Sequence, residues 1–280
     1  MKFSAAAAVL LLLSRASAQT DSGPPGTVAT APPATPATAP CDAAAQAAEL
    51  LGRVEERHAK SAFFRAAFLM EQFDALESET DLRRGRVIVD GAPGPERSFA
   101  IIIDQHIDSD GRGSTEARRF VYRDGWLAEI DETRKQFIKR QLARRGEALD
   151  PLRVGEGPFP LPLGQRRDDV LREFEAFIAP MPERQVLASM GECVALRLIP
   201  RAGTPLARET AEFRIAYDPV TLLPKAIEVL DVNGDRTTAL VRDASTEQQL
   251  SAEEQRLLSA ETPSGAEWSV DLRPLAEPAK

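Results

Sequence analysis

The sequence predicts an α+β fold in which a mainly antiparallel β-sheet is covered by helices and a loop. About ten segments of the 280-residue chain have strand character, and most follow one another through short turns. Two further segments have the apolar spacing of amphipathic helices. Charged and apolar side chains alternate along many strands, so we expect one face of the sheet to meet water and the other to be covered.

The N-terminus predicts a secretory signal peptide over residues 1–18. Lys2 is followed by an apolar run at residues 5–13 and by the small residues 16–18. Residues 19–40 contain six Pro, five Thr and five Ala. Such a composition buries too little apolar surface to order itself, so we expect a disordered linker over 19–42. A single domain over 43–275 and a short tail over 276–280 complete the chain.

The two predicted helices bracket the first group of strands. The first carries Ala47, Leu50, Leu51 and Val54 at helical spacing, with Asp42 as a possible N-cap. The second helix is expected over residues 170–178. Its apolar stripe consists of Val170, Leu171, Phe174, Phe177 and Ile178. Before it, residues 155–164 are rich in Pro and Gly and form an apolar loop.

Strands are expected in two groups, each with recognisable turns. Residues 123–125 and 232–235 have the composition of hairpin turns. A last strand alternates Trp268, Val270 and Leu272 with polar residues. The predicted strands cover residues 63–73, 86–90, 99–103, 119–122, 126–130, 136–142, 194–199, 212–217, 225–232, 237–241 and 268–272.

Composition argues against several classes of protein. The formal net charge of −8 does not favour nucleic acid as a partner. His58 lies on the first predicted helix. His106 lies next to Asp104 and Asp108, which could be half a metal site but in such a turn are more often plain loop residues. We therefore expect no enzyme activity, no metal and no cofactor. Cys41 and Cys193 could form one disulfide in an oxidising compartment or remain separate thiols.

A basic stretch on one predicted hairpin has two interpretations. It contains Arg134, Lys135, Lys139 and Arg140. These side chains could meet a partner protein or an anionic lipid surface, or they could form the solvated face of a strand pair.

The strongest positive signal is an excess of apolar side chains on the sheet. Residues 99–103 are apolar on both faces of their strand. If helices and loop close tightly over such residues, they form an ordinary core; if they close loosely, they leave a dry cavity suited to acyl chains. The candidate cavity residues are Phe99, Ile101, Ile103, Phe120, Tyr122, Trp126, Phe159, Phe174, Phe213, Ile215 and Tyr217.

The order of these elements resembles that of the periplasmic outer-membrane lipoprotein carriers, the LolA-like family, over most of residues 45–275. The similarity lies in the apolar run 63–68, the aromatic-x-Asp-Gly turn within 120–126, the strand and turn at 213–225, and the Pro-rich loop 157–163. The last of these resembles divergent lipoprotein-sorting relatives.

The resemblance implies an unclosed β-barrel whose helical and loop lid encloses a hydrophobic cavity. It implies a soluble, monomeric periplasmic protein that shields lipid or lipoprotein acyl chains on the way to the outer membrane. Its partners would be those chains and transport proteins of the inner and outer membranes. In this family an Arg near an early strand holds the lid shut, and Arg97 is the nearest candidate here. A sensor or regulatory protein that acts through protein contacts is the alternative on the same fold.

Overall fold

The computed structural model describes residues 40–144, 147, 149–154, 163, 165–246 and 249–275, with the side chains of residues 40 and 41 excepted. The predicted signal peptide, most of the predicted linker, the tail and Phe159 lie outside these residues. Within this part of the chain no helix is long and apolar enough to cross a membrane.

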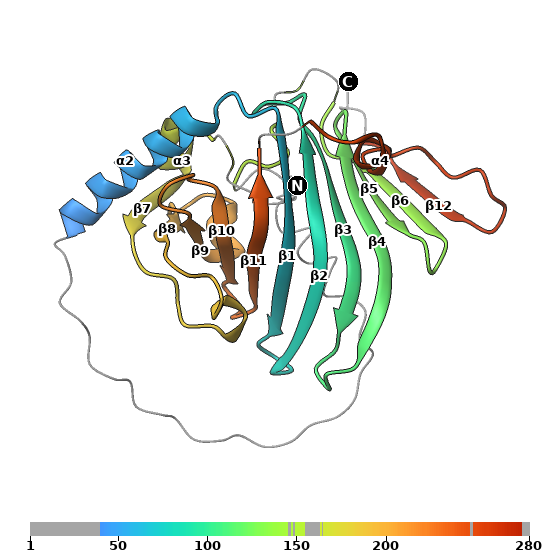
Figure 1. Cartoon of the computed structure of the whole chain (residues 1–280), viewed down its shortest axis with the longest axis horizontal. Coiled ribbons are helices and arrows are strands. Elements are labelled where there is room, and N and C mark those ends of the chain that lie inside the picture. The colour runs from blue at the N-terminus through green and yellow to red at the C-terminus, as the bar shows by residue number, and fades with distance from the viewer. Residues whose placement is uncertain are drawn as a thin grey trace.

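The described chain forms one curved, open sheet of twelve strands with three α-helices (Figure 1). The strand order is β12-β6-β5-β4-β3-β2-β1-β11-β10-β9-β8-β7, so β12 and β7 are the two edges. The helices are α2 (Pro40–His58), α3 (Arg167–Glu173) and α4 (Ala252–Leu257), with 3₁₀ turns at Gln185–Leu187 and Leu206–Arg208. The strands are β1 (Phe63–Asp74), β2 (Glu79–Asp90), β3 (Ser98–Ile107), β4 (Gly113–Arg123), β5 (Trp126–Asp131), β6 (Gln136–Gln141), β7 (Phe174–Ile178), β8 (Val194–Pro200), β9 (Thr210–Tyr217), β10 (Pro224–Asp231), β11 (Arg236–Ser245) and β12 (Ser269–Arg273).

The predicted fold class is confirmed. All neighbouring strands pair antiparallel except β12 and β6, which pair parallel. Two groups of consecutive strands, β1–β6 and β7–β11, join where β1 pairs with β11. The first strand therefore lies in the middle of the sheet, and the later strands extend it to one side.

The second predicted helix is shorter than expected. The chain is helical only over Arg167–Glu173, and the prediction of helix at 174–178 is wrong because these residues form β7. The side chains of Phe174 and Phe177 fit a helical period, but the segment completes the sheet by pairing with β8. At the other end, α2 begins at Pro40, inside the segment expected to be linker.

Both faces of the sheet carry apolar clusters, so the expectation that one face meets water is wrong. On the α2 face, Phe99, Ile101 and Phe120 belong to the largest cluster, together with residues of α2. On the α4 face, Ala100, Ile102 and Val121 pack with Leu250 and Leu258 from the C-terminal segment. Alternation along β3 explains why residues 99–103 are apolar on both sides.

Gly85 of β2 allows close contact between neighbouring strands. A Cβ at this position would lie 2.0 Å from the carbonyl oxygen of Ile102 and 2.7 Å from Cζ of Phe68. Any larger residue would therefore push β2 away from β3 at the register shift between Arg84 and Gly85.

Candidate functional site

The predicted cavity residues, except two, gather on the α2 face of the sheet. Their rings pack in pairs: Phe99 stacks on Tyr122 at 5.7 Å between centroids, and Phe174 meets Phe213 edge-on at 5.6 Å. All are at most 3% exposed and belong to one cluster. They are Phe99, Ile101, Ile103, Phe120, Tyr122, Phe174, Phe213, Ile215 and Tyr217. Phe159 lies outside the described residues.

Helix α2 is one part of the cover over this cluster. Its buried stripe of Ala47, Leu50, Leu51 and Val54 is the stripe predicted from the sequence. The acidic residue Asp42 lies in its first turn and Arg57 in its last, as the helix dipole favours. Glu55 also accepts a hydrogen bond from the backbone N–H of Arg167 at 2.9 Å, which joins α2 to the start of α3.

A segment between β6 and α3 is the second part of the cover. We call the described residues 149–154 and 163 the covering segment. Leu152, Val154 and Leu163 are at most 2% exposed and pack into the same cluster as the aromatic residues of the sheet. The carbonyl of Leu152 accepts a hydrogen bond from the buried amide of Gln165 at 2.9 Å, which fixes the segment at its C-terminal side.

Arg97 joins the covering segment to the sheet. It lies immediately before β3 and is 1% exposed. Its Nη1 donates to the carbonyl of Leu163 at 3.2 Å and lies 3.7 Å from Oδ1 of Asp150. The other carboxylate oxygen of Asp150 accepts the backbone N–H of Gly94 at 3.2 Å. The residue selected from the sequence as a lid-locking candidate therefore contacts the cover directly.

The loop before β3 positions Arg97. Gly91 has a φ of 101°, and a Cβ there would lie 3.1 Å from the Cα of Arg97. Its N–H donates to the carbonyl of Ala62 at 2.8 Å, which ties the loop to the start of β1. Glycine thus lets the chain turn back tightly enough to place a guanidinium under the cover.

Burial controls the electrostatics of this contact. It lowers the pKa of Arg97, although Asp150 opposes the change, and it raises the pKa of Asp150 against the opposing effect of Arg97. Burial also raises the pKa of Tyr122 to about 12, with Asp150 and Asp124 adding to the effect. Among the described residues, Nε and Nη2 of Arg97 have no hydrogen-bond partner. The contact is thus a buried and incompletely satisfied polar interaction within an apolar cluster.

His58 holds the C-terminal end of α2 against the turn between β9 and β10. It is 2% exposed, and its Nε2 lies 3.2 Å from the carbonyl oxygens of both Thr221 and Leu222. Burial lowers its pKa, so the ring is neutral at pH 7.

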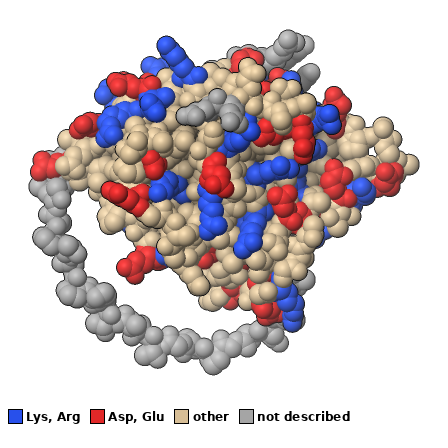
Figure 2. Space-filling view, viewed as in Figure 1, with Lys and Arg blue, Asp and Glu red and all other residues tan. Residues whose placement is uncertain are grey.

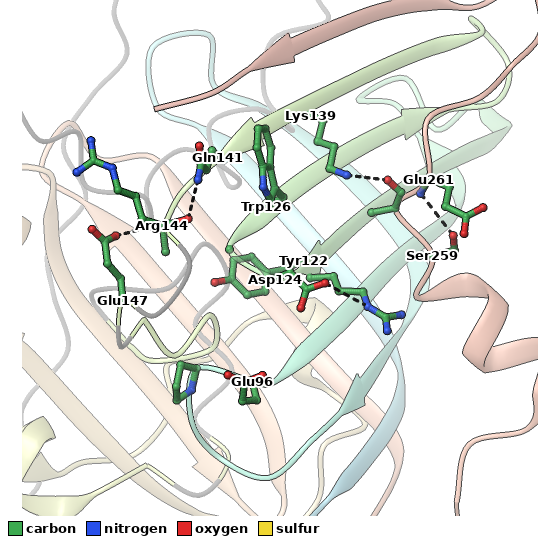
Figure 3. Close-up of a pocket in the computed structure, with 15 residues that line it drawn as sticks. Glu96, Tyr122, Asp124, Trp126, Lys139, Gln141, Arg144, Glu147, Ser259 and Glu261 are labelled. Carbon is green, nitrogen blue, oxygen red and sulfur yellow. Dashed lines mark hydrogen bonds and ion pairs between the residues drawn. The ribbon is translucent and has the colours of Figure 1, made fainter. Parts of the chain in front are cut away.

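Trp126 lies apart from the other candidate cavity residues. Its neighbour Leu127 belongs to the α2 cluster, so alternation places Trp126 on the α4 face. There it lines a pocket of about 980 Å³ at the ends of β4, β5 and β6. Figure 3 shows its ring beside Lys139, whose Nζ lies 5.6 Å from the ring centroid and donates to the carbonyl of Ala260 at 3.1 Å. Polar side chains make up much of the wall, among them Glu96, Asp124, Gln141, Arg144, Glu147 and Glu261.

The basic residues proposed as a partner surface mostly contact the chain's own C-terminal segment. Lys135 places Nζ 5.2 Å from the ring centroid of Trp268, and Arg140 lies opposite Arg273 in the sheet. Arg134 is the most exposed of the four, with 67% of its side chain exposed and Nε 3.9 Å from the carboxylate of Asp131, and Lys135 exposes 45% of its side chain. Figure 2 shows acidic and basic side chains interspersed over the visible face of the molecule.

The remaining candidates take simple structural roles. Nε2 of His106 lies 3.3 Å from Oδ2 of Asp81 in the neighbouring strand. In the described part of the chain no group of three His, Cys, Asp or Glu side chains could hold a metal ion. Cys193 is a free, half-buried thiol, while the side chain of Cys41 lies outside the described residues.

Comparison with known proteins gives similarity at the level of structure. No protein-family model matches the chain, and no curated protein matches it. An uncharacterized conserved protein from Thermus thermophilus is similar, with 15% identity, a TM-score of 0.44, and coverage of 81% of this chain and 99% of that one. A LolA superfamily protein from Nitrosomonas europaea has 11% identity, a TM-score of 0.34 and coverage of 74% and 96%. A chain of the Pseudomonas aeruginosa MucA/MucB complex has 16% identity, a TM-score of 0.36 and coverage of 80% and 63%. At these values we infer function from the side chains of this protein alone.

Proposed function

We propose that this protein is an exported, non-catalytic binding protein that shields lipid or lipoprotein acyl chains between its sheet and the cover on the α2 face. A role in moving such chains towards an outer membrane follows from this binding. The apolar residues that support the proposal are those of the largest cluster, which gather under α2 and the covering segment. The other buried apolar clusters are smaller.

The single observation that carries the proposal is the contact of Arg97 with the cover. A permanent core would be at least as stable with apolar side chains at both position 97 and position 150, because burying an ion pair carries a large desolvation cost. In a cover that opens, the hydration of these polar groups in the open state also matters. When the covering segment lifts, Arg97 and Asp150 can both be hydrated, so part of the cost of exposing the core is recovered.

The energies allow acyl chains to drive such an opening. Burial stabilises by about 0.8 kcal/mol per CH₂, so a chain of about 16 carbons gains on the order of 12 kcal/mol. Removing one partner of a buried ion pair costs about 3–5 kcal/mol, and opening the cover costs less than this at the Arg97 contact because Arg97 and Asp150 both become hydrated. The gain therefore exceeds the cost of breaking the Arg97 contact and leaves a surplus for exposing part of the core.

Uptake of a fluorescent fatty acid by the purified protein tests this function. We expect Arg97→Met to take up the probe about tenfold faster, because the contact that holds the cover contributes to the opening barrier. The matched control is Arg123→Met, since Arg123 is exposed and pairs only with the exposed Asp124. No uptake by any of the three proteins, together with no lipid found by native mass spectrometry after purification from the cell envelope, would exclude acyl binding.

A further inference from the structure

The C-terminal residues 249–275, which we call the C-terminal arm, are held by two unequal parts. The first part is anchored, because Leu250, Leu258 and Ala260 are buried on the α4 face at no more than 8% exposure. A salt bridge of 3.2 Å between Arg65 and Glu254 and a capping box at Ser251 hold α4 as well. The second part is the edge strand β12, which residues 261–268 connect to the anchor without forming helix or strand.

Strand β12 is weakly held. It has five residues, four of which are exposed. Val270 and Leu272 expose 42% and 53% of their surface, so the strand contributes little apolar burial. Its pairing with β6 is also the only parallel pairing in the described sheet. Its loss would leave the anchored part of the arm in place.

The register between β12 and β6 determines which backbone N–H groups of β12 can donate hydrogen bonds to β6. The N–H of Ser269 donates to the carbonyl of Lys135 at 2.8 Å. In a parallel pair every second residue faces the neighbouring strand, so the N–H groups of Asp271 and Arg273 also point to β6. Those of Val270 and Leu272 point away from β6, at the outer edge.

The side chains of β12 match those of β6 only in part, because Asp271 attracts Arg140 while Arg273 repels it. Arg273 lies directly opposite Arg140, which places two positive charges in one cross-strand pair. The guanidinium of Arg273 instead binds Asp271 of its own strand, with Nε 2.8 Å from Oδ2. Nε of Arg140 is buried and has no hydrogen-bond partner among the described residues. Lys139, which lies opposite Leu272, adds a further positive charge to β6.

We infer that β12 is a displaceable strand, and that the edge of β6 binds an extended acidic segment of a partner protein in its place. An acidic residue at the position of Arg273 would pair with Arg140, where the resident strand places a like charge. Backbone hydrogen bonds to β6 would be conserved in the exchange, so side-chain complementarity would decide between the two strands. The exchange is independent of acyl binding on the α2 face.

A labelled peptide tests the exchange with the full-length protein. The probe has the sequence of residues 266–275 with Arg273 replaced by Glu, carries fluorescein, and is followed by fluorescence anisotropy. Proline at position 271 removes an N–H that points to β6 and should release β12. We therefore expect Asp271→Pro to bind the peptide about tenfold more tightly than the unmodified protein. Leu272→Pro is the matched control, because it removes an N–H that points away from β6, and it should bind as the unmodified protein does.

A charge exchange tests the assigned partner chemistry. In the Asp271→Pro background, Arg140→Glu should reverse the preference, so that a peptide with the natural Arg at position 273 binds more tightly than the one with Glu. Equal binding of both peptides to both proteins would overturn the acidic assignment. Equal binding of the probe to the unmodified protein and to Asp271→Pro would overturn the displacement itself.

Hydrogen exchange in the unmodified protein provides a test that needs no variant. The amide of Lys139 faces β12, whereas that of Arg140 faces β5, because successive residues alternate. If β12 detaches while the sheet remains folded, the Lys139 amide exchanges at least about tenfold faster than the Arg140 amide. Equal protection of the two amides would show that β12 does not detach separately.

Discussion

The two covers of the sheet differ in how they are fixed. On the α2 face, α2 and the covering segment bury a large cluster, and polar contacts from Arg97 and His58 hold them. On the α4 face, the C-terminal arm is held by apolar side chains at its start and by backbone pairing at its end. In the first cover, α2 and the covering segment are therefore each held by a buried polar contact. The second cover is anchored at residues 250–260 but only weakly held at β12.

Breaking the first cover at Arg97 should have the largest effect. Arg97→Met removes the hydrogen bond to Leu163 and leaves Asp150 without its buried partner. We expect the free energy of unfolding to fall by about 3 kcal/mol. Urea unfolding at pH 7 measures the loss, with Arg123→Met as a control expected to change stability by less than about 0.5 kcal/mol. A stable Arg97→Met protein would mean that Arg97 only fills space.

Two leucines within the C-terminal arm sharpen the contrast between its ends. Leu258 is 2% exposed and Leu272 is 53% exposed. We expect Leu258→Ala to cost about 2.5 kcal/mol through the cavity it leaves, and Leu272→Ala to cost less than about 0.5 kcal/mol. Thermal unfolding of both variants checks this. Similar losses at the two positions would contradict the division of the arm into an anchored and a loose part.

Measuring stability as a function of pH tests the contact of His58, which holds α2 in the cover on the α2 face. Burial lowers the pKa of His58 in the folded protein, so the unfolded chain binds a proton first as the pH falls. The contribution of His58 is fully present above pH 6.5 and is lost as the pH falls below that value. Between about pH 7.5 and 5.5 we expect the protein to lose more stability than a His58→Gln variant does. Parallel stability profiles for the two proteins would show that the ring is not held neutral.

Local sequence patterns were sufficient for most of the fold. The apolar run of residues 99–103 and the turn at 123–125 predict strands that the structure contains. The stripe containing Leu50 and Val54 likewise predicts α2. The pattern at 174–178 was ambiguous, because Phe174 and Ile178 fit both a helix and a buried edge strand, and only pairing with β8 decides between them.

The candidate site was only partly predictable. Arg97 was selected by a family resemblance, and the structure places it against the cover. The apolar character of Trp126 suggests a place in the α2 cluster, but its position in the strand puts its ring on the α4 face. The pairing of β12 with β6 was not predicted, since contacts between residues so far apart in the chain leave no local periodicity. The burial of Leu258, which lies in the anchored part of the same arm, has no local signal for the same reason.

The parallel pairing of β12 also determines when this strand can join the sheet during synthesis and folding. Strand β6 is synthesised well before residues 269–273, and no turn can bring these two strands together early. Until the C-terminal arm has crossed the α4 face, a nascent chain presents an open strand edge beside bare apolar surface. Such an edge can be captured by other strands. Pairing of β12 with β6 therefore protects this edge from unwanted association, and the proposed displacement of β12 would determine when a partner gains access.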